Sequence, residues 1–200
     1  DGVLAAGCGY GAELALWKDR FNLFHITGID SNPAAFAAFD WTHNCRLLCA
    51  SVEEIVPKFE GRYHFTKIVA LDSCYHFPDK LQFFKDAFQL LPGRGKVGVT
   101  DICLAHRSGR AGYSCLSWLP VLLRLCGIPW HNMWTPHEYK EHLLSLGYEQ
   151  VHVEQLDQEG ESVLEGWLPA CLRKHVTYVM ATATKPMPTS SSSSSTTTRS

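Results

Sequence analysis

A glycine-rich turn followed by a well-spaced carboxylate is the pattern in this sequence that points most directly to a bound ligand. The turn spans residues 7–11 (Gly-Cys-Gly-Tyr-Gly), and Asp30 comes 19 positions after its last glycine. Glycines let a backbone approach a ligand without a Cβ clash, and a carboxylate can accept hydrogen bonds from both hydroxyls of a ribose. Because the spacing suits a strand–helix–strand unit, the pattern predicts a bound ribonucleoside.

This kind of turn is shared by more than one class of protein. Residues 7–12 also fit the loose dinucleotide pattern G-x-G-x-x-A. The turn alone therefore leaves three interpretations open: an NAD-dependent oxidoreductase, a methyltransferase, or a glycine turn that holds no ligand.

Two adjacent side chains are candidates for chemistry beside such a ligand. His76 could act as a general base, because an imidazole can take up a proton near neutral pH. Tyr75 could position a substrate hydroxyl or face a cation, because aromatic faces attract cations. For each of them, a packing role is an equal alternative. Asp101 could bind a cationic group, but we favour the simpler interpretation that it caps a turn at the end of a strand.

Neither a metal nor a nucleic acid is predicted as a partner. The eight cysteines are scattered and include no C-x-x-C pair, so we interpret them as buried, reduced thiols in a reducing compartment. The histidines near the middle of the chain lack the spacing of a metal-binding helix. Lysine and arginine together number 18 against 20 acidic residues, with no basic stripe that could follow a phosphate backbone.

Apolar strands alternate with helices through most of the chain, which predicts an α/β fold with a parallel sheet covered on both faces. Strands are expected near residues 3–6, 24–29, 45–50, 64–71, 96–100, 150–155 and 177–182. Helices are expected at residues 12–21 and 79–91, after residue 32, and between residues 135 and 147. For the last of these, Thr135 with Glu138 three positions on predicts an N-terminal cap, Pro136 suits the first helical position, and Gly147 predicts the end. Ligands of such sheets bind beyond the carboxyl ends of the strands, where we expect the glycine turn, Asp30, Ser51, Asp72 and Asp101.

One domain accounts for residues 1–185. Within it, we interpret residues 103–134, approximately, as an inserted helical cap, whose apolar stretch is too short and interrupted to span a membrane. That stretch could touch a membrane surface, or it could be buried in the cap. The Ser/Thr-rich residues 186–200 are predicted to be disordered. Because the chain opens inside an apparent strand, we expect its first residues, and any targeting segment, to be missing.

Several segments together resemble a known family. Residues 3–11 resemble motif I of the class I S-adenosylmethionine-dependent methyltransferases, V-L-D-x-G-C-G-x-G. Further segments are similar to later motifs of that family and follow in the family's order: residues 26–33, 50–55, 65–77, 90–96 and 146–148. The resemblance implies a Rossmann-like three-layer sandwich, with a seven-stranded, mostly parallel sheet whose last strand is antiparallel. It also implies S-adenosyl-L-methionine as the cofactor, and it is nearest to the small-molecule branch.

The resemblance assigns a set of residues to the cofactor. By their positions in the family's motifs, these are Gly7, Cys8, Gly9, Asp30, Ser31, Ser51, Val52 and Asp72. Two positions depart from the family pattern. Ala5 stands where an acid usually orients the methionine end of the cofactor, and Ser51 stands where an aspartate often contacts the adenine amine. These departures could weaken binding or mark an inactive relative.

The sequence therefore predicts a methyltransferase of the cytoplasm or of an organelle that methylates an O, C or N atom of a small molecule. The apolar and tryptophan-containing cap suggests a lipophilic or aromatic acceptor. Two alternatives stay open. One is an NAD-dependent oxidoreductase, and the other is a non-catalytic binding protein derived from a methyltransferase.

Overall fold

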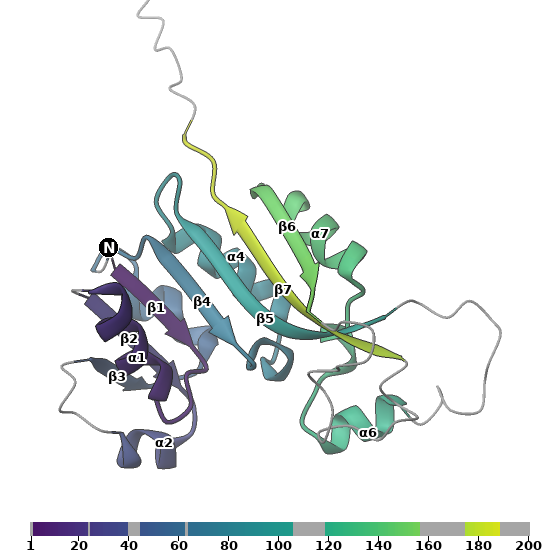
Figure 1. The fold of residues 1–200 in the computed structure, drawn as a ribbon, viewed down its shortest axis with the longest axis horizontal. Helices are drawn as coiled ribbons and strands as arrows, with labels where there is room; N and C mark the ends of the chain where they lie inside the picture. Colours follow the sequence, from purple (N-terminus) through teal and green to yellow (C-terminus); the bar gives the residue numbers. More distant parts are fainter. Residues whose placement is uncertain are drawn as a thin grey trace, which may run out of the picture.

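A seven-stranded sheet organises the chain, in the strand order β3-β2-β1-β4-β5-β7-β6 (Figure 1). The computed structural model describes residues 2–23, 25–39, 45–62, 64–105, 119–156 and 175–188. The strands are β1 (Gly2–Ala6), β2 (His25–Asp30), β3 (Arg46–Cys49), β4 (Lys67–Leu71), β5 (Lys96–Leu104), β6 (Glu149–Gln155) and β7 (Val176–Thr184). The α-helices are α1 (Ala12–Phe21), α2 (Pro33–Ala38), α3 (Ile55–Phe59), α4 (Lys80–Leu90), α6 (Leu119–Leu125) and α7 (Pro136–Ser145). The 3-10 turns within these described ranges are η2 (Val52–Glu54), η3 (Cys74–His76) and η4 (Trp130–Asn132).

The first five strands pair in parallel, and β7 runs antiparallel between β5 and β6. This arrangement confirms the predicted mostly parallel sheet with an antiparallel last strand. It also brings the carboxyl ends of β1 to β4 to one edge of the sheet, so the loops that follow these strands are neighbours.

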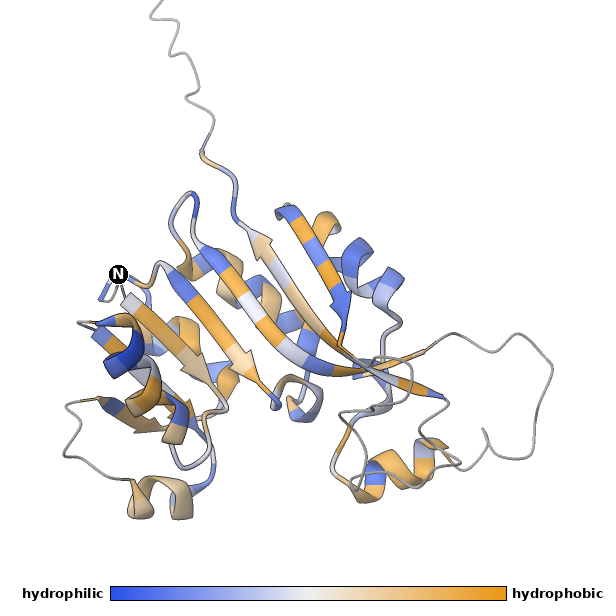
Figure 2. Cartoon of the chain, viewed as in Figure 1, coloured by the Kyte–Doolittle hydropathy of each residue, from blue (hydrophilic) through white to orange (hydrophobic). Residues whose placement is uncertain are grey.

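Both faces of the sheet are covered, because alternate residues of a strand point to opposite sides. In β1, Leu4 and Ala6 pack into the main core, to which α3, α4 and α7 contribute. Val3 and Ala5 pack on the other face, into a second cluster with Leu14 of α1. Figure 2 shows β1 and most of β4 in apolar colours, whereas β6, at the edge of the sheet, alternates between polar and apolar residues. The result is the predicted three-layer sandwich.

The fifth strand is longer than the sequence predicts. It was expected to end near Thr100, but it continues to Leu104 because residues 101–104 pair with residues 176–179 of β7. This extension supports a third apolar cluster, which includes Leu119 and Leu123 of α6. Figure 1 shows α6 beyond the carboxyl end of β5. Residues 103 and 104, which were placed in the expected cap, therefore belong to β5.

Helix α6 buries one side and leaves the other open. Leu119 and Leu123, one turn apart, are buried, whereas Val121, Leu122 and Leu125 are exposed. Within the described ranges, no helix has both the length and the apolar character needed to cross a membrane. Residues 106–118 of the expected cap and residues 189–200 of the expected tail lie outside the described part of the chain.

The ends of the helices follow local rules. The side chain of Thr135 accepts a hydrogen bond from the backbone of Glu138, and the Glu138 carboxylate accepts one from the backbone of Thr135. Pro136 occupies the first turn of α7, and Gly147 follows the helix with a φ of 92°. Each of these features was predicted from the residue types, because helix caps depend on residues within a few positions of one another.

Candidate active site

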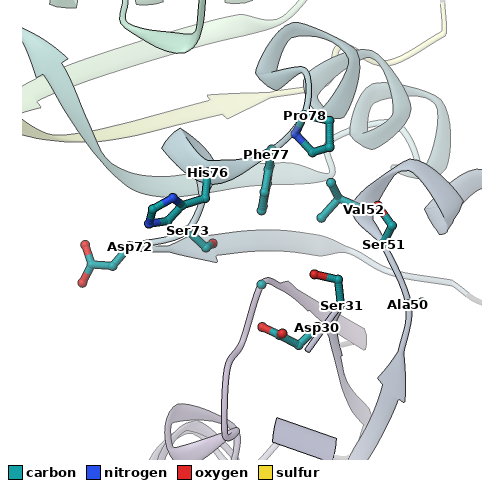
Figure 3. A pocket seen from close by; sticks show the side chains of 11 residues that line it. Asp30, Ser31, Ala50, Ser51, Val52, Asp72, Ser73, His76, Phe77 and Pro78 are labelled. Carbon is teal, nitrogen blue, oxygen red and sulfur yellow. The ribbon is translucent and has the colours of Figure 1, made fainter. Parts of the chain in front are cut away.

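A pocket of about 420 Å³ opens at the carboxyl ends of β1 to β4, within the size range of small-molecule sites (Figure 3). Its walls are formed by residues Gly7, Asp30, Ser31, Ala50, Ser51, Val52, Asp72, Ser73, His76, Phe77 and Pro78. Most of the residues selected from the sequence are among them. The exceptions are Cys8, Gly9, Tyr75 and Asp101.

The glycine turn is held close to two neighbouring strands. The amides of Gly7 and Cys8 both donate to the carbonyl of Ile29, at 2.8 and 3.1 Å, which ties the turn to β2. Gly7 has a φ of 67°, and a Cβ added there would lie 2.6 Å from the Cβ of Ser73. A side chain at this position would therefore collide with the segment that follows β4, and glycine is required by both conformation and space.

Asp30 is fixed in orientation by two backbone amides. Its Oδ2 accepts from the amide of Gly9 and its Oδ1 from the amide of Asn32, each at 2.8 Å. An ionised carboxylate has about four lone-pair sites, so two of them are still available. Figure 3 shows Asp30 and Ser31 across the pocket from Phe77. The carboxylate is thus held ready to accept further hydrogen bonds from a ligand.

Gly9 therefore belongs to the site through its contact with Asp30, although it does not line the pocket. It has a φ of 52°, and a Cβ there would meet no atom within 4 Å. At Gly9, glycine is favoured by backbone conformation alone.

Ser51 and Val52 are positioned by the start of a short helical segment. The Oγ of Ser51 accepts from the amide of Glu53 at 3.4 Å, and the Glu54 carboxylate accepts from the amide of Ser51 at 3.0 Å. This reciprocal cap begins η2 and fixes the direction of the chain at the pocket wall. The serine that departs from the family pattern thus performs a local structural task, which an aspartate could also perform.

Cys8 points away from the pocket. Its side chain is 5 % exposed and belongs to the second cluster with Ala5 and Leu14. Burial, and then the negative charges of Glu13 and Asp30, raise the pKa of Cys8 to about 12. The thiol is therefore neutral and part of the core, and Cys8 contributes to the site through its backbone, whose amide helps to tie the turn to β2.

Asp72 is anchored from two other strands. Its amide donates to the hydroxyl of Thr100 at 3.1 Å, and that hydroxyl donates to Asp72 Oδ1 at 3.2 Å. The hydroxyl of Tyr178 on β7 donates to the same carboxylate oxygen. Burial, followed by this hydrogen bond, raises the pKa of Tyr178 above its usual range. These contacts hold Asp72 at the edge of the pocket with a φ of 50°.

His76 lines the pocket and is held by its ring. Its Nδ1 lies 3.2 Å from the carbonyl oxygen of Gly127. Because a carbonyl only accepts hydrogen bonds, we assign the proton of the neutral imidazole to Nδ1, which leaves Nε2 as an acceptor. Nε2 is then the nitrogen able to take up a proton.

Tyr75 lies behind His76 and does not line the pocket. It is 5 % exposed and packs in the third cluster, beneath α6, with its ring centroid 4.5 Å from that of His76. Burial, and then the charges of Asp72 and Asp101, raise the pKa of Tyr75 to about 12. The structure therefore gives Tyr75 packing contacts that support the neighbouring imidazole.

The prediction that Asp101 caps a turn near the substrate entrance is wrong. Asp101 is completely buried within β5, and its Oδ2 lies 2.8 Å from the Nζ of Lys80, which is also completely buried. The hydroxyl of Tyr139 donates to the same oxygen at 3.0 Å. Asp101 does bind a cation, but this cation belongs to the chain itself.

Four residues of the pocket wall were not selected from the sequence, namely Ala50, Ser73, Phe77 and Pro78. Ala50, Ser73 and Phe77 each directly adjoin a selected residue, and Pro78 is two positions from His76, so closeness in the sequence was the available signal. Ser73 also has a bonding role, because its Oγ donates to the carbonyl of Ala6 at 2.9 Å and joins the ends of β1 and β4. In the described ranges, no group of three His, Cys, Asp or Glu side chains could hold a metal ion.

Comparison with known proteins identifies the family. A family model described as a methyltransferase domain matches residues 2–153. The chain belongs to this family. The match confirms the resemblance seen in the sequence motifs, and the comparisons give no support to the NAD-dependent oxidoreductase alternative.

Two relatives show how much of a longer methyltransferase this chain matches. Erythromycin 3''-O-methyltransferase of Saccharopolyspora erythraea is 29 % identical over 182 residues, which cover 87 % of this chain and 58 % of that protein. Haemonchus contortus phosphoethanolamine N-methyltransferase 2, solved with phosphomonomethylethanolamine and S-adenosylhomocysteine, superposes with a TM-score of 0.69 at 17 % identity, covering 94 % of this chain and 49 % of that one. The chain thus spans little more than half the length of the first of these relatives.

The same fold also occurs in a protein named for another reaction. The [4+2]-cyclase SpnF superposes with a TM-score of 0.65 at 19 % identity, covering 94 % of this chain and 76 % of that one. Fold alone therefore does not decide the reaction, which has to be argued from the site.

Proposed function

We propose that this domain binds S-adenosyl-L-methionine in the pocket and transfers its methyl group to a small molecule. The observation that carries the proposal is the carboxylate of Asp30. It lines the pocket, opposite the loop after β4, with both oxygens oriented by backbone amides. Family membership and the motifs around this residue favour a sulfonium nucleoside over a dinucleotide.

The residues present fit such a cofactor. Asp30 would accept hydrogen bonds from the two ribose hydroxyls, and the absence of a Cβ at Gly7 lets the turn pack closely without filling the pocket. Ser51 and Val52 would border the base, while Asp72 and Ser73 would border the other end. Bound there, S-adenosyl-L-methionine would supply a methyl group carried on a sulfonium.

His76 is the residue that we propose as the general base. With Nδ1–H directed to the Gly127 carbonyl, Nε2 would accept the proton of an acceptor hydroxyl as its oxygen attacks the methyl group. For an amine acceptor, the neutral nitrogen would attack, and Nε2 would take the proton from the methylated ammonium that forms. Holding the acceptor in line with the methyl group supplies much of the rate in reactions of this kind, and the base adds to it. Tyr75 would act by supporting the imidazole from behind.

We further propose an acceptor with an apolar part. Phe77 and Pro78 form the side of the pocket that faces the cap, and the imidazole of His131 on the cap contacts the Pro78 carbonyl at 2.8 Å. Beyond it, α6 presents mostly apolar residues (Figure 2). If the protein methylated only small polar amines or acids, this part of the proposal would fail.

Calorimetric titration with S-adenosylmethionine, S-adenosylhomocysteine and NAD tests the cofactor. We expect both sulfur nucleosides to bind and NAD not to bind. Asp30→Ala should weaken their binding by about 100-fold or more, because two hydrogen bonds to a charged group are lost. Asp19→Ala removes an equal charge from the exposed side of α1 and should leave the affinity unchanged. Binding of NAD alone would overturn the proposal.

A second candidate function follows from Ala5. This residue stands at the position of the usual acid and is buried in an apolar cluster, so it supplies no carboxylate to the cofactor. A non-catalytic binding protein would retain affinity for S-adenosylhomocysteine but transfer no labelled methyl group to any acceptor in a broad panel that includes lipophilic alcohols, phenols and amines. Transfer to any member of the panel would exclude this alternative.

A further inference from the structure

A buried amide on the cap, that of Asn132, binds three backbone groups in the segment that carries His76. Its Nδ2 donates to the carbonyl of Phe77 at 2.6 Å and to that of Tyr75 at 3.3 Å. Its Oδ1 accepts from the amide of Lys80 at 3.0 Å. Asn132 is 1 % exposed, so these contacts are made away from water.

The two carbonyls that Asn132 binds belong to the residues on either side of His76. Because the backbone is held on both sides of His76, the orientation of the Cα–Cβ bond of His76 is fixed. The far end of the segment is also anchored, since the side chain of Lys80 is paired with Asp101 inside the core. Asn132 thus joins η4 to a segment whose far end is anchored in the core by Lys80.

The ring of His76 is held by the same stretch of the cap. The carbonyl of Gly127, five residues before Asn132, contacts Nδ1 of His76 at 3.2 Å. The chain around these residues is held by its own hydrogen bonds. The backbone amide of Asn132 donates to the carbonyl of Pro129, and the backbone amide of Met133 donates to the carbonyl of Trp130. A displacement at Asn132 would therefore also move the Gly127 carbonyl relative to the imidazole.

We propose that Asn132 is a positioning residue that, together with the Gly127 carbonyl, sets the orientation and the Nδ1–H tautomer of His76. This inference rests on the general-base role given to His76 in the proposed function. Asn132 itself is not among the residues that line the pocket. It acts on the reaction through the segment at residues 75–80.

The cofactor side of the pocket makes no such contact with Asn132. Gly7, Asp30 and Ser51 are held by the turn after β1, by β2 and by η2. Changes at Asn132 should therefore affect proton acceptance and leave cofactor affinity intact. A general loss of structure would instead lower both.

The test combines the histidine tautomer with activity. Long-range proton–nitrogen spectra of histidine-labelled protein, with His76→Gln to assign the signal, report which ring nitrogen carries the proton. Wild-type protein should show the Nδ1–H form. Asn132→Ala and the equally sized Asn132→Asp, which lacks the Nδ2 donor, should show mixed tautomers. Their kcat should fall by about 10- to 100-fold, as expected when a reacting group is misplaced, with unchanged affinity for S-adenosylhomocysteine.

Tyr148→Phe is the matched control. Its hydroxyl donates to the carbonyl of Phe84 at 2.9 Å in the core, so this variant also removes a buried side-chain hydrogen bond to a backbone carbonyl. It should lower thermal stability without altering the tautomer or kcat.

The possible results distinguish a failure of the Asn132 proposal from a failure of the proposed function. An Nε2–H form in the wild-type protein would overturn the proposal without any variant, even if the Asn132 variants failed to fold. Folded variants with the wild-type tautomer and kcat would overturn it as well. Failure of the wild-type protein to bind S-adenosylhomocysteine would instead count against the proposed function, because the tautomer is measured without cofactor.

Discussion

Lys80 and Asp101 form an ion pair at 2.8 Å in which both side chains are completely buried. The ammonium also lies over the rings of Trp134 and Tyr139, at 4.3 and 4.7 Å from their centroids. Asp101 accepts further hydrogen bonds from the hydroxyl of Tyr139 and the amide of Ile102. The pair therefore joins the start of α4 to the middle of β5, directly behind the segment that forms one wall of the pocket.

Replacing Lys80 by methionine should lower the free energy of unfolding by about 3 to 5 kcal/mol near neutral pH, because Asp101 is left buried without its cation. Burial raises the pKa of Asp101, and the Lys80 ammonium opposes this rise. In the variant, the pKa of Asp101 in the folded state should therefore lie further above its value in the unfolded chain. A raised pKa of this kind stabilises the fold at low pH, and the contribution is lost as the pH rises through it.

In urea unfolding, the free energy of unfolding of Lys80→Met should therefore fall below that of the wild-type protein by less at about pH 4 than at about pH 7. The double variant Lys80→Met/Asp101→Asn removes both charges and should recover part of the lost stability. A deficit in Lys80→Met that does not change with pH would contradict the assignment of the cost to the unpaired Asp101 carboxyl.

A comparison of Gly7 with Gly61 separates two costs of adding a side chain: the strain of a left-handed backbone and the collision of the Cβ with neighbouring atoms. Gly7 and Gly61 have nearly equal φ values, 67° and 68°, but a Cβ at Gly61 would meet no atom within 4 Å. Gly61→Ala should cost about 1 to 2 kcal/mol through the left-handed conformation alone. Gly7→Ala should cost about 1 to 3 kcal/mol more, because its Cβ would collide with Ser73.

Thermal unfolding of both glycine variants, with titration of S-adenosylhomocysteine, checks this difference. Gly7→Ala should also weaken binding, whereas Gly61→Ala should not. Equal losses of stability in the two variants would show that Gly7 and Ser73 lie further apart than the structure has them.

Much of the fold follows from short-range patterns in the sequence. The helix expected at residues 12–21 has those bounds in the structure, and the cap formed by Thr135 and Glu138 is as predicted. Such features depend on residues within a few positions of each other. The end of β5 could not be predicted in this way, because it depends on pairing with β7, more than 70 positions along the chain.

The residues of the site also differ in whether short-range sequence patterns predict them. Gly7 and Asp30 were found because the length of a strand–helix–strand unit fixes their spacing. Lys80 was not found, because a lysine at the start of a helix is usually exposed, and its partner lies 21 positions away. The contacts of Asn132 with Tyr75 and Phe77 span 57 and 55 positions, so only the folded arrangement reveals them.

The thiols should differ sharply in reactivity. Of the described cysteines, Cys49 and Cys126 are exposed, whereas Cys8, Cys45, Cys74 and Cys103 are buried. Burial raises the pKa of Cys8 to about 12, so its thiol stays protonated, and therefore unreactive, at the pH of alkylation. Brief alkylation of the native protein, read by peptide mass spectrometry, should therefore label Cys49 and Cys126 and spare the four buried cysteines of the described ranges.

Alkylation in denaturant provides the control for this experiment, because all of these thiols should then react. Labelling of Cys8 in the native protein as fast as Cys49 would place its side chain outside the core. In that case the thiol, and not only the backbone of the turn, would have to be considered as a ligand contact.

His76 and Tyr75 were both selected from the sequence as candidates for chemistry, and variants can separate them. His76→Gln keeps an amide that can donate to the Gly127 carbonyl but cannot take up a proton, so kcat should fall by about 100- to 10,000-fold. Tyr75→Phe keeps the ring that packs beside the imidazole, so kcat should stay within about a factor of three of the wild type. Neither change should alter the affinity for S-adenosylhomocysteine, since the Asp30 side of the pocket is untouched. His137→Gln, an exposed change on α7, controls for the substitution itself. A larger loss in Tyr75→Phe than in His76→Gln would reverse the two roles and make the phenol hydroxyl the group that acts on the acceptor.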